Sequence, residues 1–341
     1  MKISFGVASL FFLLLFSACE QKNVSASRAL FWGFAMEGFP ITKELLDEQK
    51  KKTMINPGLI LFYLQWPSPS SKPASVKESL NSIWEIGALP CLSWEPMYYQ
   101  EKSELIIPCE DILSGRYDHY LTFAAEEIKA WGKPLVIRFA HEMNISRYHW
   151  GVEKANYDKG YPSKYKKMFQ YVVDFFRLKQ VNNVLWAFCP NSDSIPGESW
   201  NSASNYYPGD RYVDILGMDG YNWDVTANIA AEKHLDWIKP WQSFEQIFHP
   251  LFLELIKLAP TKPVIVFETA SVDRSGGQKS LWIRDALATA KKWGLTGIIW
   301  FEMKKEEDWN IEQNGDYSYL PFVLENTSSS QTWVEGVIKV E

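Results

Sequence analysis

Short apolar stretches alternate with longer amphipathic stretches along most of the chain. Eight of the apolar stretches are seven to nine residues long, rich in β-branched and aromatic side chains, and almost uniformly apolar. Such runs are typical of strands that are buried on both faces of a parallel sheet. The predicted strands are Ala29–Met36, Leu59–Trp66, Leu89–Pro96, Pro134–Glu142, Val184–Pro190, Val213–Tyr221, Pro263–Ala270 and Gly297–Met303.

The stretches between these strands show helical spacing. In 75–86, for example, one helical face carries Val76, Leu80, Ile83 and Trp84. Several stretches end in a glycine just before the next strand, as Gly87, Gly132 and Gly294 do, which is typical of helix C-caps. The predicted helices are Lys43–Met54, Ser75–Ile86, Tyr117–Trp131, Ser163–Leu178, Ser243–Leu258 and Gln278–Trp293.

Eight strand–helix units over roughly 300 residues predict an α/β fold, a single (β/α)8 barrel. An open doubly wound sheet is the alternative, but no Gly-x-Gly-x-x-Gly follows the first strand and no P-loop occurs. The segment 191–210, rich in Ser, Asn, Pro and Gly, is expected to be a long loop with at most a short helix. The C-terminal Trp333–Glu341 is expected to fill the last helix position.

The N-terminal segment reads as an export signal outside the fold. Met1 and Lys2 precede an apolar run, 3–16, that is too short to span a bilayer comfortably. The small residues before Cys19 resemble the lipobox of bacterial lipoproteins, whose cysteine is lipidated; a plain secretory signal with a chance cysteine is the alternative. We expect a signal peptide at 1–18, a lipidated tether at 19–28 and a catalytic barrel at 29–341. The protein would then cross the inner membrane and stay anchored at the cell envelope through its lipid only.

Composition narrows the class of protein. The 341 residues are 46% apolar and 22% charged, which is ordinary for a globular protein. The net charge of −6, without a Lys/Arg-rich run, argues against nucleic-acid binding. We read Cys91 and Cys189, within apolar runs, as packing residues, and five histidines argue against a metal cluster. We therefore expect a monomer without metal or cofactor. The 16 tryptophans exceed what a core needs, and flat amphipathic rings also stack on sugars.

The strand ends should carry the chemistry, because the active site of such a barrel lies at the C-terminal ends of its strands. These ends are rich in carboxylates and aromatics and lack a Gly-x-Ser-x-Gly nucleophile elbow. His141 and Glu142 begin like a zinc-protease helix, but Ile145 stands where the second histidine is required. Two carboxylates among aromatic platforms are what glycoside hydrolysis needs. Six strand ends carry an acid, so spacing alone leaves the pair open.

One segment is more specific. The run Arg138–Asn144, with the sequence RFAHEMN, resembles the signature of glycoside hydrolase family 26. That family contains β-mannanases, together with some mixed-linkage β-glucanases and β-1,3-xylanases. Four further segments resemble it too, and the likeness runs from about residue 30 to about residue 312. These segments are 94–96, 217–222, 264–269 and 300–309.

The resemblance implies a retaining mechanism with catalytic glutamates on strands four and seven. It assigns Glu142 as the general acid/base and Glu268 as the nucleophile. Arg138 would hold Glu268 ionised, Tyr221 would donate a hydrogen bond to it, and His141 would contact the catalytic centre or the sugar. A retaining enzyme needs an acid with a raised pKa beside a nucleophile that stays ionised.

The same resemblance makes Trp300 the platform beneath the sugar that is cleaved. Further substrate-binding or supporting residues are expected to be Trp94, Glu95, Trp150, Trp223 and Trp309. The chain departs from the family after Asn144, where many members have Gly and then a Trp. Here Tyr148 or Trp150 would line the leaving-group side.

The sequence is compatible with three functions. The first is a secreted retaining endo-β-glycosidase that hydrolyses β-1,4-mannan by double displacement. The second keeps the mechanism but acts on mixed-linkage β-1,3-1,4-glucan or β-1,3-xylan. The third is a surface lipoprotein that binds oligosaccharide without cleaving it. The presence of both glutamates argues against the third.

Overall fold

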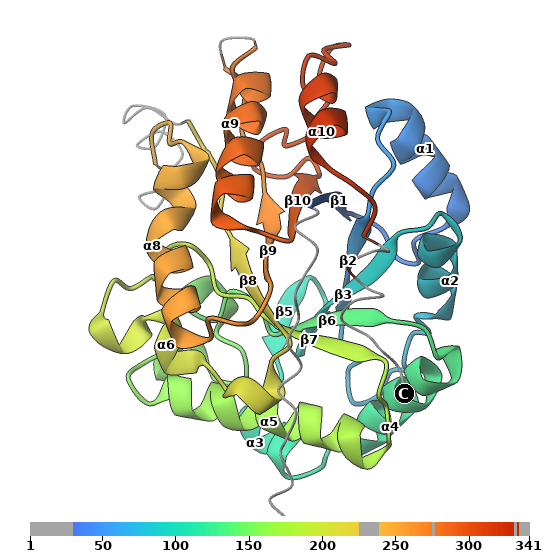
Figure 1. Ribbon diagram of the computed structural model, residues 1–341. Helices are drawn as coiled ribbons and strands as arrows, with labels where there is room; N and C mark the ends of the chain where they lie inside the picture. Colours follow the sequence, from blue (N-terminus) through green and yellow to red (C-terminus); the bar gives the residue numbers. More distant parts are fainter. Residues whose placement is uncertain (1–29, 225–238, 275–276, 331–332, 334–341) are drawn as a thin grey trace, which may run out of the picture.

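The computed structural model describes residues 30–224, 239–274, 277–330 and 333. Eight parallel strands close into a barrel, and helices surround it on the outside (Figure 1). Each barrel strand pairs with the barrel strand that follows it in the sequence, and the last barrel strand pairs with the first. The barrel strands are β1 (Phe31–Met36), β2 (Leu59–Gln65), β3 (Leu89–Glu95), β6 (Leu135–Phe139), β7 (Val184–Phe188), β8 (Ile215–Asp219), β9 (Val264–Thr269) and β10 (Gly297–Glu302).

A helix follows each barrel strand, and sequence signals explain several helix ends. Ser243 and Gln246 form a reciprocal capping box at the start of α8. Gly132 and Gly294 end α4 and α9 in the left-handed conformation, which glycine adopts without strain. The helices are α1 (Lys43–Thr53), α2 (Lys77–Glu85), α4 (Asp118–Trp131), α5 (Tyr161–Leu178), α6 (Ala203–Tyr206), α8 (Phe244–Leu258), α9 (Gln278–Trp293) and α10 (Leu320–Asn326).

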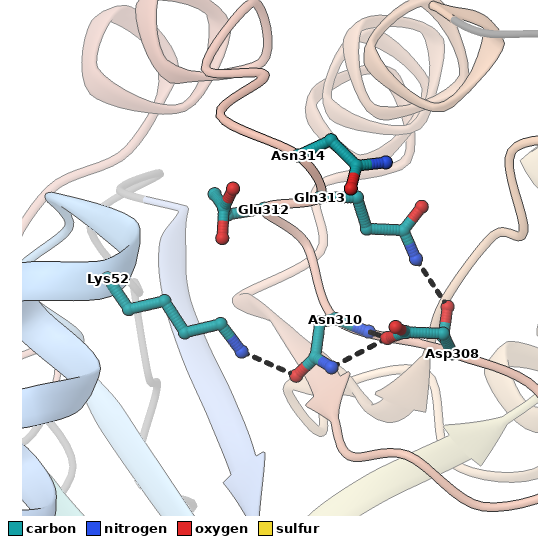
Figure 2. A pocket seen from close by; sticks show the side chains of 6 residues that line it. All are labelled: Lys52, Asp308, Asn310, Glu312, Gln313 and Asn314. Atoms are coloured by element: carbon teal, nitrogen blue, oxygen red, sulfur yellow. Dashed lines mark hydrogen bonds between the residues drawn. The ribbon is translucent and has the colours of Figure 1, made fainter.

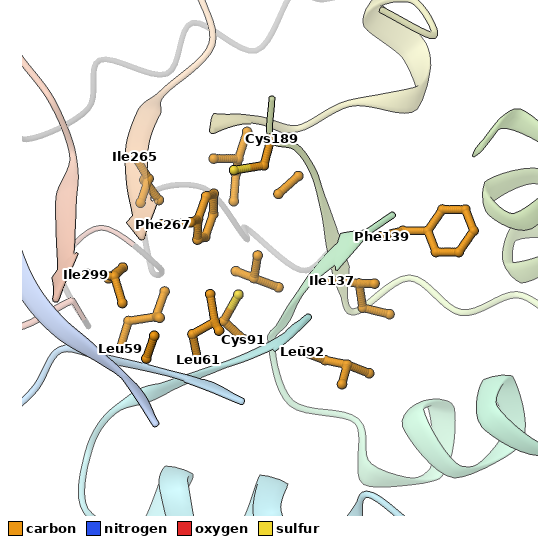
Figure 3. Packing of buried hydrophobic residues seen from close by; sticks show 14 of the residues in the cluster. Leu59, Leu61, Cys91, Leu92, Ile137, Phe139, Cys189, Ile265, Phe267 and Ile299 are labelled. Carbon is orange, nitrogen blue, oxygen red and sulfur yellow. The ribbon is translucent and has the colours of Figure 1, made fainter. Parts of the chain in front are cut away.

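The predicted (β/α)8 barrel is confirmed, and each of the eight predicted strands is a strand of the barrel. Alternate residues of the strands fill its interior. Leu61, Cys91 and Cys189 point inward in Figure 3, whereas Ile137 and Phe139 point toward the helices. Because the inner and outer faces are both apolar, the strand pattern is nearly continuous rather than alternating.

One excursion from the barrel was not predicted. Between β3 and α4 the chain forms an antiparallel hairpin, β4 (Met97–Gln100) and β5 (Ser103–Ile106), and a short helix, α3 (Cys109–Leu113). The hairpin turns at Glu101 and Lys102, with φ angles of 49° and 75°. Both are non-glycine residues, so the usual Asn-Gly or Gly-Gly signal of such a turn is absent from the sequence.

The two chain ends lie mostly outside the described residues. Helix α10 follows the last barrel strand, and the expectation that 333–341 fill the last helix position falls almost wholly on residues outside the described ranges. Trp333 is buried, with its ring centroid 5.8 Å from that of Phe31, and 334–341 lie outside the described residues. The predicted signal peptide, Cys19 and the tether also lie outside them. Within the described ranges, no helix has the length and apolarity required to cross a membrane.

Candidate active site

Glu268 reaches the barrel interior through an irregularity in β9. Ile265 and Phe267 point inward (Figure 3), so strict alternation would turn Glu268 outward. Just after Val266, however, the register shifts by one residue against both neighbouring strands. This β-bulge re-aims the glutamate toward the inside, a common use of bulges beside active sites.

The Glu268 carboxylate is buried and accepts hydrogen bonds from three side chains. Tyr63 donates to its Oε1 at 2.7 Å, Arg138 forms an ion pair with the same oxygen, and Tyr221 donates to Oε2. Burial on its own raises the pKa of this carboxyl, but the Arg138 charge and the two hydroxyls outweigh burial and lower the pKa to about 2. Glu268 is therefore held ionised.

Arg138 is the buried hub of the site. It forms an ion pair with Asp219 at 2.6 Å, and its Nη2 and Nε donate to Ser93 Oγ at 2.8 and 3.1 Å. Its side chain is fully buried, and although burial disfavours the charge, Asp219 and Glu268 keep the pKa of the guanidinium well above its usual value. A planar donor fork suits this task, because it reaches two carboxylates at once.

Glu142 lies in a tight turn that follows the end of β6. Ala140 and Glu142 have φ angles of 48° and 51°, a region that non-glycine residues rarely adopt. The turn is pinned by hydrogen bonds from Ala140 N to the Trp94 carbonyl, 3.0 Å, and from Glu142 N to the Cys189 carbonyl, 2.8 Å. This geometry explains why β6 ends at Phe139, before the predicted end at Glu142. Such local strain is characteristic of functional sites.

The environment of Glu142 is the opposite of that around Glu268. Its carboxyl is buried and accepts one hydrogen bond, from Asn191 Nδ2 at 2.6 Å. Burial and the charge of Glu268 raise its pKa to about 7. Two carboxyls whose surroundings drive their pKa values apart can divide the work of acid and nucleophile between them.

His141 and two aromatic rings form one wall of the site. Burial and the charge of Arg138 lower the pKa of His141 well below its usual value, so the imidazole is neutral. The Tyr148 ring lies 4.9 Å from His141 and stacks on Trp150 at the same distance. Trp150 is fully buried, whereas Tyr148 is half-buried, so Tyr148 presents the accessible face.

The opposite wall is built around Tyr221. Its ring centroid lies 5.1 Å from that of Trp309 and 5.4 Å from that of Phe301. Trp223 meets Trp309 edge-on at 4.8 Å and is half-buried. The structure thus brings the predicted residues Tyr221, Trp223 and Trp309 together beside Glu268.

The loop after β10 supplies Trp309 to this wall and is held by polar contacts (Figure 2). Lys52 Nζ on α1 donates to Asn310 Oδ1 at 2.7 Å, and Asn310 Nδ2 donates to Asp308 at 2.6 Å. Lys52 also forms an ion pair with Glu302 at 2.9 Å. This strand-end acid therefore helps to hold the lysine that binds the loop. Within the same loop, the Lys305 ammonium lies 5.2 Å from the Phe301 ring.

The structure does not bring two of the predicted residues to the glutamates. Trp94 alternates with the inward-facing Ser93 and Glu95, so its ring points outward, where its indole donates to Tyr120 at 2.7 Å. Trp300 is fully buried, 6.1 Å from Trp282 of α9. Trp300 was expected to be the sugar platform and Trp94 a substrate-binding or supporting residue. Strand alternation instead places both in the layer between barrel and helices.

Three site residues were missed or left undecided by the sequence. Tyr63 lies two residues before Gln65, at the end of β2, so both side chains point to the same face of the strand. This alternation was the sequence signal that could have located Tyr63 near the site. Asp219 was one of several strand-end acids, and its ion pair with Arg138 now gives it a role. Asn191 lies just beyond β7, in the long loop.

Glu95 is a further buried carboxyl at this end of the barrel. It accepts a hydrogen bond from Gln65 Nε2, and burial raises its pKa to about 7. Among the described residues, no group of three His, Cys, Asp or Glu side chains is placed to hold a metal ion. The arrangement can supply a proton, a charged nucleophile and aromatic faces, all from the protein.

The fold and site define a (β/α)8-barrel protein with a protonatable and an ionised glutamate at the strand ends. Residues 113–239 match the family model described as glycosyl hydrolase family 26. Endoglucanase H of Acetivibrio thermocellus is 32% identical over 247 residues, which are 70% of this chain and 24% of that protein. A mannan endo-1,4-β-mannosidase of Bacillus subtilis is 25% identical over 183 residues, 48% of each chain. These matches show that the chain is similar to members of glycoside hydrolase family 26.

Solved structures agree on the fold. The catalytic domain of a family 26 endo-β-1,4-mannanase from Bacillus sp. JAMB-750 superimposes with a TM-score of 0.63 at 20% identity, covering 93% of this chain and 91% of that one. A family 26 β-mannanase from Bacteroides ovatus gives 0.57 at 19% identity, with 90% of each chain covered. The chain spans less than half the length of the curated relatives named above.

Proposed function

We propose that this protein is a retaining endo-β-glycosidase that hydrolyses β-1,4-mannan with Glu142 and Glu268. The observation that carries the proposal is the contrast between the two buried carboxyls. Glu268 is surrounded by donors, with a pKa of about 2, whereas Glu142 accepts a single amide hydrogen bond, with a pKa of about 7. At mildly acidic pH one is ionised and the other protonated, which is what the first chemical step requires.

In that step, Glu268 attacks the anomeric carbon while Glu142 gives its proton to the leaving oxygen. The bond between carbon and leaving oxygen breaks, and a glycosyl ester of Glu268 forms. Glu142, now ionised, then removes a proton from water, which attacks the same carbon and releases Glu268 as a carboxylate. Arg138 and Tyr63 stabilise that carboxylate as it leaves.

The names of the relatives support the substrate. Several curated relatives are called mannan endo-1,4-β-mannosidases, and several structural neighbours are called endo-β-1,4-mannanases. A β-glucan is the second candidate, because the relative that is 32% identical over 70% of this chain is called an endoglucanase. Product analysis on galactomannan, lichenan, laminarin and β-1,3-xylan separates these substrates. Failure to cut any of them would favour oligosaccharide binding without cleavage.

Active-site variants test the mechanism. Glu142→Ala and Glu268→Ala should each lower turnover by several orders of magnitude in a folded protein. Azide should rescue Glu142→Ala with a glycosyl azide of retained configuration, and Glu268→Ala with one of inverted configuration. Near-normal activity in either variant, or the opposite pairing of configurations, would contradict the assigned roles.

We also propose that residues 1–18 direct export and that Cys19 carries the lipid that anchors the protein to the cell envelope. The support is the apolar run followed by Ser17, Ala18 and Cys19. Labelled fatty acid should be incorporated into the full chain and not into the Cys19→Ala variant. Equal labelling of the two proteins would overturn the proposal.

A further inference from the structure

A second groove, of about 530 Å³, lies beside the active site. One side is formed by β5 and the residues that lead into α3. The other side is formed by the segment that follows Tyr148, up to Asn156, and by Lys164 near the start of α5. Its volume is in the range of small-molecule binding sites. Neither catalytic glutamate lines it, so it is a feature separate from the centre described above.

A continuous series of contacts joins this groove to the catalytic centre. The Tyr148 ring lies 4.9 Å from His141, which precedes Glu142 in the chain. The Arg147 guanidinium lies 4.9 Å from the Tyr148 ring and forms an ion pair with Glu104 at 2.6 Å. Glu104 in turn lines the groove. The groove therefore begins one side chain beyond Tyr148.

The lining fits a neutral, hydroxyl-rich ligand. Glu104 is paired with Arg147, and Glu110 with Lys164 at 3.4 Å. Glu153 and Lys154 also line the groove and balance each other in charge, so neither sign dominates. Lys154 and Asn156 line the groove with side chains that have no partner among the described residues. Half-buried apolar side chains from β5 contribute to the lining. Polar groups around an apolar surface are what a sugar ring requires, because its hydroxyls lie at the edge and its C–H groups on the faces.

The position of the acid decides which part of the glycan would reach the groove. The nucleophile approaches the anomeric carbon from the side opposite the leaving group, and the acid stands beside the leaving oxygen. One side of the groove belongs to the segment that follows Glu142, and Glu268 contributes nothing to it. A chain that continues past Glu142 and Tyr148 is the portion that carries the reducing end.

We propose that this groove binds the reducing-end portion of the glycan, beyond the sugar that leaves. Lys154 and Asn156 donate hydrogen bonds to its hydroxyls. The inference rests on the proposed hydrolase function and extends it, because it makes cleavage depend on chain length on the leaving-group side. Long chains are then cut at a greater distance from their reducing ends than the catalytic centre alone would require.

The test is a double variant, Lys154→Ala with Asn156→Ala, both exposed positions. The substrates are oligosaccharides of increasing length, isotopically labelled at the reducing end and drawn from whichever polysaccharide the unaltered protein cuts. We expect the gain in kcat/KM from added reducing-end sugars to fall about three- to tenfold, as expected for one or two lost hydrogen bonds. Cleavage should also move toward the reducing end. Lys72→Ala, on the exposed loop before α2, is the matched control and should keep the original pattern.

Two outcomes overturn the inference and are distinguishable. If the unaltered protein cleaves oligosaccharides and the double variant keeps the same length dependence and cleavage positions, the groove does not bind the glycan. If the unaltered protein cleaves no β-glycan, the proposed function fails, and this inference fails with it.

Discussion

The hydrogen bond from Tyr63 to Glu268 offers a quantitative test of the site, because it joins one hydroxyl to one carboxylate oxygen. Tyr63→Phe deletes one hydroxyl and leaves the ring in place. Hydrogen bonds to charged groups contribute about 1.5–3 kcal/mol, and one pKa unit corresponds to about 1.4 kcal/mol. The pKa of Glu268, about 2 in the intact site, should therefore rise by roughly one to two units.

The sign of the effect on activity follows from the role proposed for Glu268, that of the nucleophile. A carboxylate nucleophile works only when ionised, so a raised pKa moves the acidic limb of the pH profile upward. We expect kcat/KM of the parent protein to be flat down to about pH 3, and that of Tyr63→Phe to decline below about pH 4. Breakdown of the glycosyl ester should also slow, by about tenfold, because the departing carboxylate loses a donor.

The assay is a pH profile of kcat/KM on a soluble substrate, with protein stability checked at each pH. Tyr171→Phe is the matched control, since Tyr171 also donates to a carboxylate, Asp118 at 2.7 Å, but lies on the outer helix α5. The control should follow the parent profile. An acidic limb that does not move in Tyr63→Phe would refute the claim that this hydroxyl helps to keep Glu268 ionised.

Four further outcomes are expected. The alkaline limb of kcat/KM should lie near pH 7, and Asn191→Ala should move it upward, because that amide lowers the pKa of Glu142; an unmoved limb would contradict this. Since Glu142 has a pKa of about 7 when folded, it favours folding at low pH and loses that contribution as pH rises to about 7. Glu142→Gln should therefore raise the melting temperature at pH 8 more than at pH 4, by calorimetry. Trp94→Ala should cost about 3–5 kcal/mol in denaturant unfolding without changing KM in the residual folded protein. Trp223→Ala should raise KM by several-fold with little loss of stability, and an unchanged KM would remove it from the binding wall.

Periodicity in the sequence was sufficient to predict the barrel, because eight buried strands and their helices repeat the same local pattern. It was insufficient at positions where one residue changes the direction of a side chain. The bulge after Val266 turns Glu268 inward without any glycine or proline to signal it. Ordinary alternation turns Trp94 and Trp300 outward, although both stand near strand ends where substrate-binding or supporting residues were expected. A family resemblance can locate a segment, but only the register decides which face each side chain occupies.

The hairpin of β4 and β5 shows a second limit. Its four-residue strands are too short to show a period, and its turn lacks the usual glycine. Yet it provides Glu104 and one side of the groove beside the centre. Short insertions of this kind carry little sequence signal, because few of their side chains are buried.

The pairing of β10 with β1 has a consequence for how the chain can be divided. These strands lie more than two hundred residues apart in the sequence, and Lys52 on α1 reaches Glu302 across the same junction. A nascent chain exposes the edge of β1 until the final strand emerges from the ribosome, and any fragment that stops earlier leaves two unpaired edges open to association. Even the segment 113–239, which matches the family model and holds Glu142, lacks Glu268 and the strands that close the ring. Truncated forms should aggregate rather than retain partial activity, so the enzyme-like centre is a property of the completed ring.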